Sequence, residues 1–234
     1  MSAALLKFGL AVWILATLTP SAARAQKSDL DNDLKNFPKD PGSEKQPAPP
    51  AKSPGDSAAG PQHIQPPGIY TQRFTGVAFP KRVGDFVRVA VDLYDAEARD
   101  VGASYDKKRG GNLVCIITAF SYPIPPQFAS RGAPAVFEDA KLAITSRQKD
   151  ARLLREGPYR APDGSIGDLA EYEFSIGKGA AGRVYSRLYL FESKGWLLKF
   201  RVTYPAARAR EGAAEAESFL RTFGTGVLRN QVNT

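Results

Sequence analysis

The chain has 234 residues, of which 43% are hydrophobic and 24% charged, enough for one full domain with tails or for two small ones. Its net charge is +8, and residues 69–234 carry 25 Lys or Arg against 18 Asp or Glu, or +7. The basic charge therefore belongs to the predicted folded part and favours acidic partners. The single cysteine excludes a disulfide within the chain.

Residues 1–25 have the layout of a secretory signal peptide. Lys7 precedes an apolar core, Phe8 to Leu18, and small residues occupy the two positions that an export peptidase reads before cleavage between Ala25 and Gln26. As a helix this core is about 16 Å long, short of the bilayer's roughly 30 Å, so no permanent membrane span is expected after cleavage. We expect an exported protein, periplasmic or extracellular.

Residues 26–68 have the composition of a disordered, Pro-rich linker. Their few large apolar side chains do not offset the entropy of ordering the segment, and repeated prolines favour an extended spacer. His63, the only histidine, is expected here as a solvated side chain, since a metal site needs several converging ligands.

Residues 69–234 are expected to form one globular domain, which opens with a run of strands. Alternating apolar residues and turn residues place these strands at residues 74–79, 86–94, 101–105 and 112–122. The last has apolar residues on both faces, as in a central strand covered on both sides. Between the third and fourth strands, Lys107-Lys108-Arg109 is expected at a solvated hairpin end.

A helix, four strands and a second helix follow. Pro134 suits a first helical position, and an apolar stripe continues the first helix to about residue 149. Strands are predicted at 151–156 and 168–176, and the last helix at 206–223. The stripes of the two helices are Ala133, Val136, Phe137, Ala140 and Ile144, and then Ala209, Ala213, Ala216, Leu220 and Phe223.

Residues 182–204 read as a β-hairpin with a three-residue loop, Ser193 to Gly195, in which Gly195 takes a left-handed conformation. This loop length pairs Leu190 with Leu198 and Leu188 with Phe200, and it gathers most apolar residues on one face.

The order of elements predicts an α+β fold, an antiparallel sheet with two packed helices, preceded by the signal peptide and the linker. The exported basic chain, the strands before Pro134 and the closing strand of residues 196–204 followed by a helix resemble the PsbP-like α/β sandwich of photosynthetic and bacterial envelope proteins. The resemblance covers about residues 70–223 and implies a non-enzymatic assembly or binding role.

Enzyme signatures are mostly absent from the predicted domain. With no histidine after His63, a Ser-His or Cys-His nucleophile pair cannot form, and no phosphate-binding loop appears. Cys115 is expected to be a buried, inert thiol, with a reactive thiol as the alternative. The remaining candidates for catalysis are Asp168, Glu171 and Glu173, of which the two glutamates share an outward face, where solvated charge is expected. We expect no cofactor, metal or disulfide.

The other face of the hairpin is the strongest candidate for binding. It interleaves aromatic rings with cations: Tyr185, Arg187, Tyr189, Lys199 and Arg201. In the predicted register Arg187 lies opposite Arg201, which is unfavourable unless an anion or carboxylate lies between them. Such a face fits an acidic polymer or a partner's carboxylates, although the same side chains could simply cover the outer sheet or lie under a packed helix.

The sequence thus indicates an exported, non-enzymatic binding or assembly protein for an acidic polymer or an envelope protein. No nucleic acid is expected because of export. The alternative is a carboxylate-based hydrolase of cell-wall or glycan substrates, which requires two facing carboxylates in a cleft.

Overall fold

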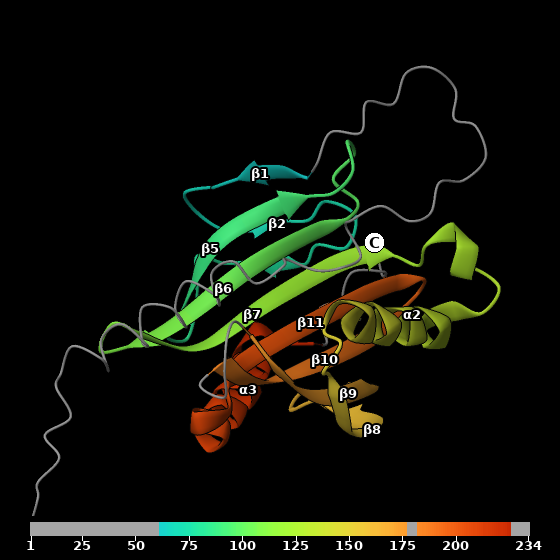
Figure 1. Ribbon diagram of the computed structural model, residues 1–234. Coiled ribbons are helices and arrows are strands. Elements are labelled where there is room, and N and C mark those ends of the chain that lie inside the picture. The colour runs from blue at the N-terminus through green and yellow to red at the C-terminus, as the bar shows by residue number, and fades with distance from the viewer. Residues whose placement is uncertain (1–60, 177–181, 226–234) are drawn as a thin grey trace, which may run out of the picture.

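The computed structural model describes residues 61–176 and 182–225, which form an antiparallel sheet and two α-helices (Figure 1). The 3-10 helices η2 (Pro126–Phe128) and η4 (Ala206–Arg208) precede the two α-helices. The main elements are β1 (Gln62–Ile64), β2 (Tyr70–Thr71), β3 (Ala78–Phe79), β4 (Arg82–Val83), β5 (Phe86–Leu93), β6 (Val101–Arg109), β7 (Asn112–Pro123), α2 (Gly132–Arg147), β8 (Arg152–Arg160), β9 (Ile166–Ser175), β10 (Arg183–Ser193), β11 (Trp196–Pro205) and α3 (Ala209–Phe223).

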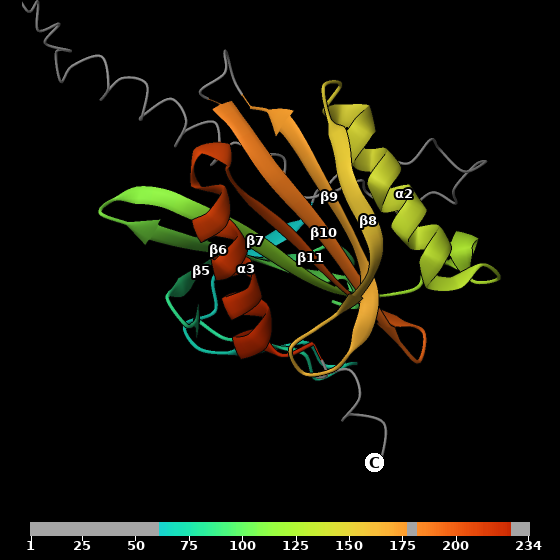
Figure 2. The same cartoon turned by 90° about the horizontal axis from the view of Figure 1, so that it is seen from below.

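The main sheet has nine strands in the order β1-β5-β6-β7-β11-β10-β9-β8, with β4 also paired to β5. β2 and β3 form a separate pair. Helices α2 and α3 lie on opposite sides of the sheet, as the view in Figure 2 shows. The predicted α+β fold, an antiparallel sheet with two packed helices, is confirmed.

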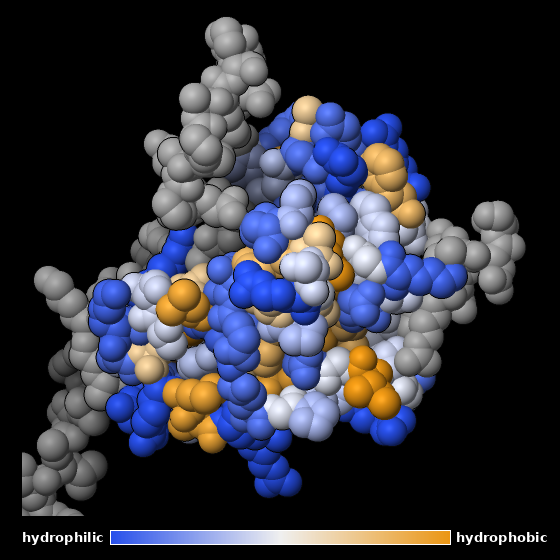
Figure 3. All heavy atoms as spheres, turned by 90° about the vertical axis from the view of Figure 1, so that its right-hand side faces the viewer, coloured by the Kyte–Doolittle hydropathy of each residue, from blue (hydrophilic) through white to orange (hydrophobic). Residues whose placement is uncertain are grey.

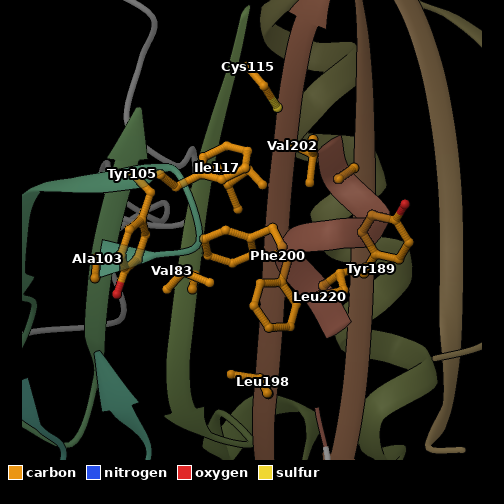
Figure 4. Packing of buried hydrophobic residues seen from close by; sticks show 14 of the residues in the cluster. Val83, Ala103, Tyr105, Cys115, Ile117, Tyr189, Leu198, Phe200, Val202 and Leu220 are labelled. Atoms are coloured by element: carbon orange, nitrogen blue, oxygen red, sulfur yellow. The ribbon is translucent and has the colours of Figure 1, made fainter. Parts of the chain in front are cut away.

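Each helix closes its own hydrophobic core. On the α3 side, Phe219 and Leu220 pack on β6, β7, β10 and β11, and Figure 4 shows Tyr105, Ile117 and Phe200 converging there. On the α2 side, the core holds the helix residues Val136, Phe137 and Ile144 with alternate residues of the same central strands. The strand predicted at residues 112–122 is therefore central and covered on both faces.

Three predictions about local structure are wrong. β1 lies inside the predicted linker, because an added edge strand satisfies the outer backbone groups of β5. His63 on this strand is exposed, as predicted, although its Nδ1 is 2.8 Å from Oδ1 of Asp92 on β5. The strand predicted at 74–79 shrinks to β3, since the backbone turns at Gly76 with a positive φ. Lys107 extends β6 and is buried.

The burial of Lys107 has an electrostatic cause. Its Nζ lies 2.6 Å from Glu215 of α3 and 3.0 Å from Asp85, and it also lies over the ring of Phe86. Burial acts to lower the pKa of Lys107, but the two carboxylates raise it above its ordinary value, so the ammonium stays charged.

The predicted signal peptide, the cleavage site between Ala25 and Gln26 and the linker up to residue 60 lie outside the described residues. Among the helices that the structure does describe, none combines the length and the apolar character needed to cross a bilayer.

The predicted register of the last hairpin is also wrong. Ser193 pairs with Trp196, so the loop has two residues, Lys194 and Gly195, with φ values of 52° and 80°. Positive φ at both positions is what a type I′ turn requires, and this turn matches the twist of the flanking strands. A two-residue loop shifts every pair by one residue relative to the predicted three-residue loop.

The shift redistributes side chains between the two faces of the sheet. Tyr189 lies opposite Phe200 and Arg187 opposite Val202 on the α3 side, whereas Leu190 lies opposite Lys199 and Leu188 opposite Arg201 on the α2 side. A helix covers each face of the sheet, so the apolar residues of β10 and β11 are divided between the two faces. Leu188, Leu198 and Phe200 are all buried, as the sequence predicts.

The turn residue Lys194 provides a test of this register. Changing Lys194→Asn is expected to raise the free energy of unfolding by up to about 1 kcal/mol, because Asn tolerates positive φ better than Lys and Asn-Gly is a favoured type I′ pair. Urea denaturation measures the change. Lys108→Asn, on a strand, serves as the control and is expected to bring no gain; destabilisation by Lys194→Asn would contradict the observed turn.

The close packing of α3 on the sheet leads to a second prediction. A Cβ on Gly212 would overlap the ring of Tyr204, so the helix approaches β11 here only because the residue is glycine. Gly212→Ala is expected to lower the free energy of unfolding by about 1–3 kcal/mol, despite alanine's better helix propensity. Ser218→Ala, on the exposed side of the same helix, should leave it unchanged or slightly higher.

Candidate functional site

A ladder of arginines and glutamates crosses three strands on the α3 side of the sheet. We define the Arg-Glu ladder as Arg152 and Arg155 of β8, Glu171 and Glu173 of β9, and Arg183 and Arg187 of β10. The three strands are neighbours, and side chains on one face alternate along each strand, so residues far apart in sequence meet here.

Glu171 lies at the centre of the ladder. Its Oε2 accepts a hydrogen bond from Nε of Arg155 at 2.7 Å, and its Oε1 accepts from Nε of Arg187 at 3.1 Å and from the hydroxyl of Tyr204 at 3.2 Å. Burial acts to raise the pKa of Glu171, but the hydrogen bonds and charges of the two arginines outweigh it and hold the pKa below its ordinary value. This carboxylate is therefore ionised at neutral pH.

Glu173 is held in the same way by two other arginines. Nη2 of Arg152 lies 2.7 Å from one carboxylate oxygen, and Nη1 of Arg183 lies 3.1 Å from the other. Arg152 is directly opposite Glu173 in the register, whereas Arg183 reaches it diagonally from β10. Both glutamates were predicted to be solvated and are instead buried, because arginines on both neighbouring strands satisfy them.

Glu217 of helix α3 lies next to the ladder, beside Arg187. Its carboxylate accepts a hydrogen bond from the Tyr159 hydroxyl at 2.5 Å and lies 3.6 Å from Nη1 of Arg187. Arg187 also lies over the ring of Tyr204, with 5.8 Å between the guanidinium carbon and the ring centroid. The buried arginine is thus fixed by α3, β9 and β11 together.

Arg152, Arg155 and Arg183 are each held in place by a glutamate, yet their side chains are exposed to solvent. The side chains of Arg152, Arg155 and Arg183 are 71%, 56% and 57% exposed, whereas the glutamates that hold them are about a tenth exposed. A guanidinium has five N–H donors, so one bond to a glutamate leaves others for a ligand in solvent. Planar, oriented guanidinium groups suit carboxylate, sulfate or phosphate oxygens.

The five residues predicted to bind together are divided between the two faces. Tyr185, Arg187 and Tyr189 lie on the α3 side, where Tyr189 is buried in the core and Tyr185 is half-buried against Tyr204. Lys199 and Arg201 lie on the α2 side.

The two α2-side cations have local partners. Nζ of Lys199 is 4.5 Å from the centroid of the Phe120 ring, and Nε of Arg201 donates to the hydroxyl of Ser186 at 2.8 Å. The predicted single basic-aromatic face therefore does not form. Arg187 and Arg201 do not lie opposite each other, so no carboxylate is needed between them; Arg187 instead binds Glu171 of β9.

The carboxylates considered for hydrolysis do not form a facing pair. Glu171 and Glu173 are on the α3 side and bound to arginines, whereas Asp168 lies opposite Leu190 on the α2 side. Burial, and then the charges of Glu156 and Glu138, raise the pKa of Asp168. A raised pKa suits a general acid, but the other two predicted carboxylates, Glu171 and Glu173, do not lie on this face and cannot pair with Asp168.

Cys115 is a buried thiol, as predicted. Burial raises the pKa of its thiol, which keeps it protonated and unreactive at neutral pH. Among the described residues, no group of three or more His, Cys, Asp or Glu side chains is arranged to hold a metal ion.

Sequence reasoning missed Arg152, Arg155, Arg183 and Glu217 as members of the site. Arg152 and Arg155 flank two leucines in a predicted strand, but the bulge between Leu153 and Arg155 brings both arginines to one face, which strict alternation does not predict. The available signal was the spacing of Glu171 and Glu173, two acidic residues on one side of a predicted strand that required cationic neighbours.

Comparisons with known proteins concern the fold. The solution structure of cyanobacterial PsbP from Synechocystis sp. PCC 6803 is similar to this chain with a TM-score of 0.44 and 14% identity, over 75% of this chain and 98% of that one. A protein of unknown function from Pseudomonas aeruginosa, PA94, described as a putative regulator, has a TM-score of 0.41 and 12% identity, over 59% of this chain and 96% of that one.

The PsbP-like resemblance expected from the order of elements thus reappears in a solved structure. Structural similarity at such low TM-scores and sequence identities concerns only the fold, and we derive no function from it. No family model matches the sequence, and no curated protein matches it.

The lowered pKa of Glu171 predicts a pH-dependent contribution to stability. A carboxyl with a depressed folded pKa stabilises the fold above its ordinary value of 4.5, and this contribution is lost as the pH falls through the folded value. Glu171→Gln is expected to cost about 2 kcal/mol at pH 7. The difference from the unchanged protein should shrink as the pH falls below 4.5.

Urea denaturation at a series of pH values measures this difference. Glu97→Gln, at an exposed surface ion pair, is the control and should change stability by a few tenths of a kcal/mol at most. A gap between Glu171→Gln and the unchanged protein that stays constant from pH 7 to pH 3 would contradict the assignment.

Proposed function

We propose that this protein is an exported, non-enzymatic binding protein that recognises an acidic partner through the Arg-Glu ladder. The observation that carries the proposal is the trio of exposed guanidinium groups, Arg152, Arg155 and Arg183, each oriented by a buried glutamate. Orienting them in the free protein reduces the entropy lost when a ligand binds.

The charge of the chain supports the same proposal. Residues 69–234 carry +7, which attracts acidic partners over a distance and increases their association rate. Figure 3 shows one side of the molecule, on which apolar residues form small groups separated by hydrophilic ones. Of the five residues predicted to bind, Arg187 alone belongs to the Arg-Glu ladder, where it is buried and holds Glu171.

Export is part of the proposal and is supported by residues 1–25. Their positive flank, apolar core and small residues before Gln26 fit an export peptidase. Residues 26–60 would then connect the processed end to the sheet. An acidic polymer of the envelope and an acidic envelope protein are the two partner classes that the charge fits.

The ladder can be tested without exposing an unpaired buried charge. In the double variant Arg152→Gln with Arg155→Gln, Glu173 keeps Arg183 and Glu171 keeps Arg187, so the fold should survive. Binding of a fluorescent octaglutamate peptide in low salt is expected to weaken at least tenfold, because two oriented donors are lost. Raising the salt concentration should weaken binding of the unchanged protein.

The matched control carries the same change of charge at a different place. Arg210→Gln with Arg221→Gln removes two exposed arginines of α3 and should weaken binding no more than two- to threefold. Equal loss in the two double variants would show that net charge alone attracts the peptide, and would overturn the ladder as the site.

A further inference from the structure

Strand β8 forms one edge of the sheet beside the ladder. In the described part of the chain it pairs only with β9, and it lies at the end of the strand order. Residues 152–156 are all exposed, on both faces of the strand, and Figure 2 shows β8 at the border of the sheet. An edge of this kind presents backbone N–H and C=O groups that can pair with an added strand.

The two halves of β8 differ in their fitness for such pairing. Pro158 in the second half has no N–H to donate, and Gly157 beside it has a φ of 155°, both of which weaken strand addition there. The first half, residues 152–156, contains neither residue, and its pairing with β9 has a bulge between Leu153 and Arg155. It carries the two ladder arginines on the α3 side and the 46%-exposed Leu153 on the α2 side.

Charge decides what this edge can accept. A second copy of the chain would bring a segment with the same excess of positive charge, two arginines against Glu156, so its net charge does not complement this edge. Acidic side chains at alternate positions of an added strand would instead lie beside the two guanidinium groups, and the intervening apolar side chains would meet Leu153 on the other face. The exposed guanidinium groups of this edge therefore favour an acidic strand.

We propose that an extended acidic segment of a partner protein adds as a further strand along residues 152–156 of β8. The segment alternates acidic with apolar residues, so that carboxylates bind Arg152 and Arg155 while backbone hydrogen bonds fix its register. This inference rests on the proposed function and specifies its partner as a polypeptide, in place of an acidic polysaccharide.

The test uses the full chain and three probes. The first is a fluorescent hexapeptide of alternating Asp and Leu, the second is the same peptide N-methylated at every second residue, and the third is dextran sulfate. N-methylation removes backbone donors without altering charge, so the second probe is expected to bind at least tenfold more weakly than the first. Hydrogen exchange at residues 152–156 should slow when the first probe binds, while β1, on the opposite edge, stays unchanged.

The outcomes separate the two proposals. Equal binding of both peptides, with loss in Arg152→Gln/Arg155→Gln, would keep the ladder as an acidic-ligand site and overturn strand addition. Tight binding of dextran sulfate with none of the first peptide would likewise overturn strand addition and identify a polymer partner. Peptide binding that is insensitive to the double variant would overturn the proposed function itself.

Discussion

The two-residue turn at Lys194 and Gly195 determines on which face of the sheet every side chain of β10 and β11 lies. Because side chains alternate along a strand, a change of one residue in the loop would exchange Arg187 with its neighbours between the two helices. In the observed register, Arg187 faces α3 and meets Glu171 from β9. The candidate site depends on this arrangement.

Burying two glutamates in a sheet is unfavourable unless their charges are compensated. Each is bound by one arginine from β8 and one from β10, so the charges are satisfied from both sides, and the three strands are tied together across their hydrogen-bonded ladders. Three of the arginines that neutralise these glutamates are exposed, and this matters for binding. The buried ends of the ion pairs fix the guanidinium groups, and the exposed ends remain available to an anionic ligand.

The position of the ladder connects its chemistry with the architecture of the sheet. Its arginines Arg152 and Arg155 are on β8, where the sheet ends, so oriented cations and an open backbone edge occur side by side (Figure 2). The opposite edge, β1, carries no comparable cluster among the described residues: it contains His63, paired with Asp92. The β8 edge therefore carries oriented positive charge, whereas the described residues of the β1 edge do not. Under the proposed function, an acidic partner would bind at the β8 edge.

The sequence alone determined the class of fold, since strand periodicity, proline breaks and the two apolar helix stripes are local patterns that only an antiparallel sheet between helices can bury. It also determined the buried thiol of Cys115 and the central position of β7, which has apolar residues on both faces. Tertiary structure decided the hairpin register, because two- and three-residue loops fit the same Ser-Lys-Gly sequence. It also decided the ladder, because whether Glu171 is solvated or buried depends on arginines 16 residues away on either side in sequence, which only strand pairing brings into contact.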